Sequence, residues 1–75
     1  MEKERNLTTL KKGEQGIIAK VISGASSLRL MEMGLVPGAK IKLSAISPFG
    51  DPIAIQVGAF SLSLRKSDAE QVLVK

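Results

Sequence analysis

The sequence predicts one small, mainly β domain: a barrel of about five short strands with one short α-helix and one helical turn. Its 75 residues leave room for a single core, so residues 1–75 are expected to form one domain. Gly and Pro divide the chain into short segments that are rich in β-branched residues or alternate between apolar and polar positions. A closed barrel is the economical arrangement for such strands, because closure leaves no exposed strand edge.

The N-terminal part is expected to begin with a loose end over residues 1–6. Leu7 and Leu10 then supply two apolar anchors ahead of a turn at 11–16. Residues 17–22, mostly Ile and Val, are too short for a typical helix and predict the first strand.

The short helix is predicted at about residues 27–34. Ser26 and Ser27 are suitable N-terminal caps, and Gly34 is suited to end the helix in a left-handed conformation. The spacing i, i+3 and i+7 directs three apolar side chains toward the core: Leu28, Met31 and Leu35.

A turn and a second strand follow the helix. Residues 36–39 have Pro in the second position and Gly in the third, as a type II turn requires. Residues 40–46 alternate, with Lys40, Lys42 and Ser44 expected outside and Ile41, Leu43 and Ala45 inside. Residues 47–52 then form a loop.

The next segment predicts a β-hairpin with a two-residue turn at Gly58 and Ala59. That turn places Val57 opposite Phe60. The apolar residues of both strands then share one face: Ile53, Ile55, Val57, Phe60, Leu62 and Leu64. The other face receives Gln56, Ser61, Ser63 and Arg65, and a shift by one residue would destroy this separation.

The C-terminal segment predicts a helical turn near 68–71 and a last strand at 72–74. Residues 67–70 have the pattern of a capping box, in which Ser67 accepts a hydrogen bond from the backbone N–H of Glu70.

The composition excludes several kinds of chemistry. The chain has no Cys and no His, so it has no disulfide, no thiolate metal site and no His base to activate a Ser. The carboxylates are scattered over turns and helix ends, where capping and solubility explain them: Glu14, Glu32, Asp51, Asp68 and Glu70. We expect no enzyme, no cofactor and no small-molecule substrate, and no preformed metal site, while weak metal binding by carboxylates is left open.

The charge pattern predicts a cytoplasmic protein without membrane insertion. The longest uncharged stretch, Pro52 to Leu64, has 13 residues, whereas a membrane-spanning helix needs about 20. The charged N-terminus has no apolar signal-peptide core.

The chain has 11 Lys and Arg against 7 Asp and Glu, which gives a net charge of +4. Only Phe49 and Phe60 are aromatic, and this is poor equipment for stacking on bases, so nucleic acid is not the expected partner.

The predicted short helix is apolar on nearly every side. Because one small core cannot cover all of it, Leu30 and Met33 are candidates for an adaptable partner-binding patch, the alternative being a satellite of the core.

Four segments, in this order, resemble the FeoA family: LKKGE at 10–14, RLMEMGLVPG at 29–38, GDPI at 50–53 and LRKSDA at 64–69. The resemblance extends from about Leu7 to Val74, and the second segment is its most specific part. It implies an SH3-like β-barrel that serves as a small cytosolic accessory of bacterial ferrous iron uptake. The partner it implies is the cytoplasmic part of FeoB, a membrane permease with a GTPase region.

Our hypothesis for the contact is a groove between residues 28–35 and the loop 48–52 that docks on FeoB. Leu30 and Met33 would anchor the contact and Arg29 would help to steer it. The full set of partner-binding candidates is Leu28, Arg29, Leu30, Met33, Pro48, Phe49 and Asp51. The alternatives are a small basic barrel associated with RNA or the ribosome, and a weak homo-oligomer formed through the apolar patch.

Overall fold

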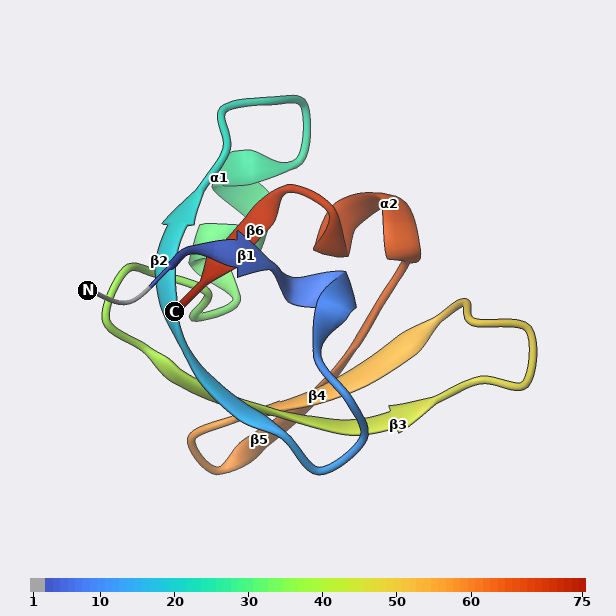
Figure 1. The fold of residues 1–75 in the computed structure, drawn as a ribbon. Helices are drawn as coiled ribbons and strands as arrows, with labels where there is room; N and C mark the ends of the chain where they lie inside the picture. Colours follow the sequence, from blue (N-terminus) through green and yellow to red (C-terminus); the bar gives the residue numbers. More distant parts are fainter. Residues whose placement is uncertain (1–2) are drawn as a thin grey trace.

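The computed structural model describes residues 3–75, which form one antiparallel six-stranded sheet with two short α-helices (Figure 1). The sheet order is β1-β6-β2-β3-β4-β5. The elements are β1 (Arg5–Asn6), the 3₁₀ turn η1 (Leu7–Thr9), β2 (Gln15–Val21), α1 (Ser27–Glu32), β3 (Lys40–Ile46), β4 (Ile53–Val57), β5 (Phe60–Leu64), α2 (Lys66–Ala69) and β6 (Val72–Val74).

The long strand β2 joins the two halves of the sheet. Its first residues pair with β3 and its last residues pair with β6, with a register shift between Ile18 and Lys20. Because β2 pairs with β3 at one end and with β6 at the other, the sheet curls around the core (Figure 1). Within residues 3–75 the ends of the sheet, β1 and β5, do not pair with each other, so the predicted closure of the barrel is not made by a strand ladder.

The core lies inside this curled sheet. Leu7 and Leu10, the two predicted anchors, are both buried. The other buried apolar residues are Ile18, Leu30, Leu35, Ile41, Leu43, Ile53, Ile55, Leu64, Ala69, Val72 and Val74.

The predicted hairpin is confirmed in its register, with Val57 opposite Phe60 and Ile53 opposite Leu64. Gly58 has a φ of +57°, which the two-residue turn requires. Burial fades toward this turn: Ile53 is buried, Val57 is half-buried and Phe60 is 72% exposed. The tip of the hairpin therefore extends beyond the core.

The predicted alternation in β3 holds only for its first half. Lys40 and Lys42 are exposed and Ile41 and Leu43 are buried, but the register shifts between Leu43 and Ala45. This bulge places one extra residue in β3, so Ala45 is exposed where the sequence predicted it inside.

The predicted loose N-terminal end is wrong for residues 5–6. Arg5 pairs with Val74 and Asn6 pairs with Leu73, because the last strand offers a free side to β1. The Oδ1 atom of Asn6 also accepts a hydrogen bond of 3.0 Å from the Thr8 amide. Residues 1–2 lie outside the described residues.

The orientation predicted for the helix is wrong for Leu28 and Met31, whereas Leu35 lies in the core as predicted. Leu28 is 70% exposed and Met31 is 42% exposed, whereas Leu30 and Leu35 are fully buried. The reason is the way in which α1 ends. Gly34, at a φ of +100°, allows the Leu35 amide to bond the Leu30 carbonyl at 3.1 Å and the Gly34 amide to bond the Met31 carbonyl at 3.0 Å. This Schellman motif typically brings the two flanking apolar side chains together, and here they are Leu30 and Leu35.

Replacing Leu30 by Ala should lower the free energy of unfolding by about 2–5 kcal/mol, because it opens a cavity in the core. The matched change Leu28→Ala on the exposed side of the same helix should shift it by less than about 0.5 kcal/mol. Urea unfolding of both variants measures the difference, and equal losses would contradict the described orientation of α1.

The predicted capping box at 67–70 is also wrong, because α2 begins at Lys66 and its N-cap is Arg65, two residues before Ser67. Its N-cap, Arg65, makes no capping hydrogen bond through its side chain. Instead, Oδ1 of Asp51 accepts a hydrogen bond of 2.9 Å from the Lys66 amide. The cap thus comes from the loop before β4 rather than from the helix itself.

Loss of this cap should cost about 1 kcal/mol in the variant Asp51→Ala. Asp51→Asn retains an oxygen acceptor at the same position and should recover most of that stability. Thermal unfolding should give a lower melting temperature for Asp51→Ala than for Asp51→Asn, and identical melting temperatures would argue against the cap.

Glu14 links the start of β2 to the N-terminal segment. Its Oε1 accepts a hydrogen bond of 2.9 Å from the Lys11 amide, and its Oε2 pairs with Arg5. The Lys11 amide, and then Arg5, lower the pKa of Glu14 from its ordinary value of 4.5.

The ionised Glu14 carboxylate therefore stabilises the fold fully at pH values above its ordinary pKa. This stabilisation is lost as the pH falls through the lowered pKa that Glu14 has in the folded state. The stability difference between the wild type and Glu14→Gln should be largest near pH 7 and shrink at pH 3. A difference that does not change across this range would refute the assignment.

Candidate protein-binding groove

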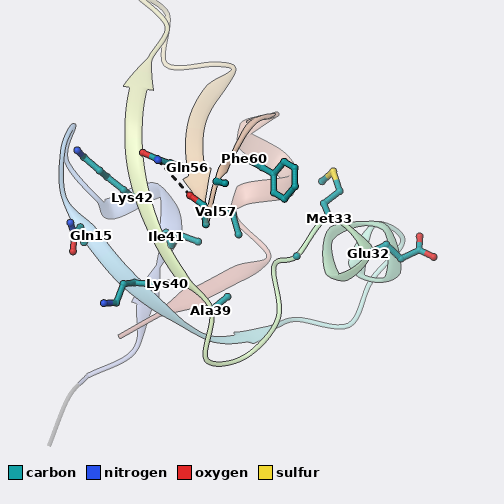
Figure 2. Close-up of a pocket in the computed structure, with 13 residues that line it drawn as sticks. Gln15, Glu32, Met33, Ala39, Lys40, Ile41, Lys42, Gln56, Val57 and Phe60 are labelled. Atoms are coloured by element: carbon teal, nitrogen blue, oxygen red, sulfur yellow. Dashed lines mark hydrogen bonds between the residues drawn. The ribbon is translucent and has the colours of Figure 1, made fainter.

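An open groove of about 800 Å³ lies between the end of α1 and the sheet formed by β3, β4 and β5 (Figure 2). Ile41 of β3 and Val57 of β4 supply apolar surface to it. One side is the segment that ends α1, with Met33 and Gly34, and another is the turn between β4 and β5 with Phe60. The groove is thus built from three parts of the chain that the tertiary fold brings together.

Met33 and Phe60 are apolar side chains that line the groove from α1 and from the β4–β5 turn, and Figure 2 shows them reaching toward each other. Met33 is the C-cap of α1 and is half-buried against the core. Phe60 follows the two-residue turn directly and is 72% exposed. A flexible thioether beside an exposed ring gives an adaptable apolar surface.

The end of α1 lies beside Val57 of β4. A Cβ atom added at Gly34 would lie 3.5 Å from Cγ1 of Val57, which is an ordinary van der Waals contact. The positive φ of Gly34, rather than a lack of space, is therefore what requires glycine at this position. On the other wall, the Gln56 side chain donates a long hydrogen bond of 3.5 Å to the Gly58 carbonyl.

The charged groups of the groove lie at its margins. Lys40 and Lys42 project from the exposed face of β3, and Glu32 points away from the apolar mouth (Figure 2). The arrangement offers apolar contact flanked by positive charge. Glu32 is the one carboxylate that lines the groove within the described chain, so no pair of carboxylates is brought together there for acid–base chemistry.

The candidates predicted on α1 have different positions. Met33 lines the groove, and Leu28 is exposed on the same helix. Leu30 is fully buried by the Schellman motif, so the prediction that its side chain anchors a partner is wrong. Arg29 is paired with Asp68 at 2.9 Å, which ties α1 to α2 and leaves the Arg29 side chain 62% exposed.

The loop candidates lie elsewhere. Pro48 and Phe49 are exposed, the latter at 96%, while Asp51 caps α2. The loop 47–52 comes directly before β4, and the Gly58 turn comes directly after it. The loop and the turn therefore lie at opposite ends of β4, which is about 16 Å long (Figure 1). The predicted groove between residues 28–35 and this loop is therefore wrong, and α1 faces the other end of the hairpin.

Met33 is the only residue lining the groove, within the described chain, that the sequence predicted as a partner-binding candidate, and Phe60 is the most exposed large apolar side chain among those it missed. The alternation of apolar and polar residues in the hairpin places Phe60 correctly on the core-facing side of the sheet, but it does not tell how far along the strand the core extends. The one sequence feature that could have indicated exposure is that Phe60 lies next to the turn, since the end of a hairpin often extends past the residues that cover it.

Two further features of residues 3–75 bear on the site. No three Asp or Glu side chains in this part of the chain gather where they could hold a metal ion. None of its helices is long and apolar enough to cross a membrane.

Comparison with known proteins identifies close relatives in sequence. A family model described as the FeoA domain matches residues 5–75. A fusion protein of Porphyromonas gingivalis, in which Fe(2+) transport protein A is joined to the Fe(2+) transporter FeoB, is 33% identical over 70 residues. The match covers 92% of this chain but only 8% of the fusion protein, so the chain corresponds to a small part of that relative.

Solved structures agree with this match. An FeoA-like protein from Clostridium acetobutylicum is 33% identical with a TM-score of 0.92, covering 100% of this chain and 88% of its own. FeoA from Stenotrophomonas maltophilia in complex with zinc, described as a prokaryotic SH3 domain protein, is 29% identical with a TM-score of 0.84, covering 95% and 89%. These similarities confirm the predicted SH3-like fold. The family match over residues 5–75, together with the Clostridium acetobutylicum protein at 33% identity, shows that this chain belongs to the FeoA family, which is linked to ferrous iron transport.

Proposed function

We propose that this chain is an accessory protein of bacterial ferrous iron uptake that binds the cytoplasmic part of the FeoB permease. The observation that carries the proposal is the fusion relative, in which an FeoA part and FeoB form one polypeptide. Fusion raises the effective concentration of two modules for each other, which favours modules that act in contact. A separate FeoA chain in the cytoplasm would reach the same contact by binding.

The surface that we propose for this contact is the groove between α1 and the β4–β5 turn. Exposed apolar side chains that gather around a concave surface are typical of partner-binding sites. Phe60 is 72% exposed and Met33 lies across from it, while Leu28 and Met31 extend the apolar surface along α1.

The charges beside the groove support a docking role. Lys40 and Lys42 flank it in a chain whose net charge is +4, so an acidic region of the permease would be attracted to this side. The exposed Arg29 can add to this attraction from α1 while it holds Asp68. These charges are expected to speed association more than they strengthen the complex.

Phe60→Ser should weaken binding to the cytoplasmic region of FeoB at least about 10-fold, because a central aromatic anchor typically contributes more than about 1.4 kcal/mol. Phe49→Ser is the matched control: the same change at the chain's other Phe, which is 96% exposed on the far loop, should leave the affinity unchanged. Titration calorimetry at low and high salt, with and without guanine nucleotides, measures both.

Three outcomes would contradict parts of the proposal. A loss of binding in Phe49→Ser alone would place the contact on the loop 47–52. Equal binding by both variants and the wild type would remove the groove as the docking surface. If the wild type does not bind FeoB and instead binds bulk RNA with steep salt dependence, the RNA-associated alternative would hold.

A further inference from the structure

The strand β5 has one side that no strand covers within residues 3–75. It is an end of the sheet and pairs only with β4. The two-residue turn fixes which groups point outward: the closing pair Val57–Phe60 is hydrogen-bonded, and such pairs alternate along an antiparallel ladder. The N–H and C=O groups of Ser61 and Ser63 therefore point away from β4, and none of them bonds to another described residue.

This edge lacks the usual protection against pairing. Natural edge strands carry Lys, Pro or a bulge, or are very short. Residues 60–64 contain no charge and no Pro, and β4–β5 pairing runs through all five residues without a register shift. The other end of the sheet, β1, is only two residues long and offers little to a partner.

We infer that β5 pairs with β5 of a second copy of this chain, antiparallel and centred on Leu62. In this register Ser61 lies opposite the partner's Ser63, and Ser63 lies opposite the partner's Ser61. All outward-pointing backbone groups of both strands are then satisfied, by four N–H···O=C bonds. Leu62 faces the partner's Leu62 as a non-hydrogen-bonded pair, which agrees with its own groups being bonded to β4.

The side chains of β5 are self-complementary in the same register. The segment FSLSL alternates apolar and polar residues symmetrically about Leu62. Phe60, which is 72% exposed, lies opposite the partner's Leu64, and the serines meet on the other face. Arg65 lies opposite the partner's Ala59, so no like charges face each other. This symmetry favours a second copy over an unrelated strand as the occupant.

The resulting dimer is expected to be weak, because pairing of two five-residue strands buries less surface than a standard stable interface. Both copies carry a net charge of +4, so added salt should screen their repulsion and favour association. Binding to RNA would show the opposite salt dependence.

Two double variants test the register. Ser61→Lys with Ser63→Lys places like charges opposite each other in both symmetry-related pairs and should weaken association at least about 10-fold. Ser61→Lys with Ser63→Glu places opposite charges in the same pairs and should restore association to the wild-type level or above it. Both serines are exposed, so neither variant disturbs the core. Sedimentation velocity up to about 1 mM protein measures association at concentrations suited to weak complexes.

Amide chemical shifts give a second readout. In the wild type, the concentration-dependent shifts should centre on the amides of Ser61 and Ser63. The variant Ser63→Pro removes one outward N–H without removing a bond to β4, and it should weaken association even if the charged variants fold poorly.

The inference is overturned if the wild type stays monomeric at about 1 mM, or if both double variants associate equally. It is also overturned if, at concentrations where the wild type is monomeric, the wild type binds FeoB and the variant with both Ser61→Lys and Ser63→Lys does not. The edge of β5 would then pair with a strand of the permease. The FeoB titration uses dilute, monomeric chain, so failure of the dimer and failure of the proposed function can be told apart.

Discussion

The last turn of α1 decides how the rest of this small domain is arranged. The bond from the Leu35 amide to the Leu30 carbonyl, which the positive φ of Gly34 allows, turns the chain sharply at the end of the helix. It places two leucines in the core and leaves Leu28 and Met31 in solvent. Because the same turn lies against Val57 of β4, it also sets the position of Met33 at the groove. Core and candidate site thus share one backbone feature.

The two-residue turn at Gly58 has a comparable influence at the other side of the groove. It fixes the register of β4 and β5, and with it the side of β5 to which each backbone group points. The turn also carries Phe60 past the end of the core, where it borders both the groove and the free edge. A permease bound in the groove and a second chain paired at β5 would compete for this ring, so the two proposed contacts are expected to exclude each other.

Membership of the FeoA family and the geometry support a binding role from different directions. The family match links the chain to a family of ferrous iron transport, and in the fusion relative an FeoA part is joined to FeoB. The groove offers exposed apolar side chains with lysines at its margin, and such a surface suits a protein partner better than a small substrate. The position that we propose for the contact rests on the structure, because the loop 47–52 and α1 are not neighbours in the fold.

Local patterns in the sequence determined the strands at 40–46 and 72–74, the turn at Pro37–Gly38 and the register of the hairpin around Gly58, because each depends on residues that are close along the chain. The RLMEMGLVPG run at 29–38 pointed to the family. The tertiary structure alone decided that Asp51 caps α2, that β1 pairs with β6 and that Phe60 stays exposed. The physical reason is that each of these depends on a segment distant in sequence, which a periodic pattern cannot report: a pattern fixes which residues share a face, but only packing decides what covers that face.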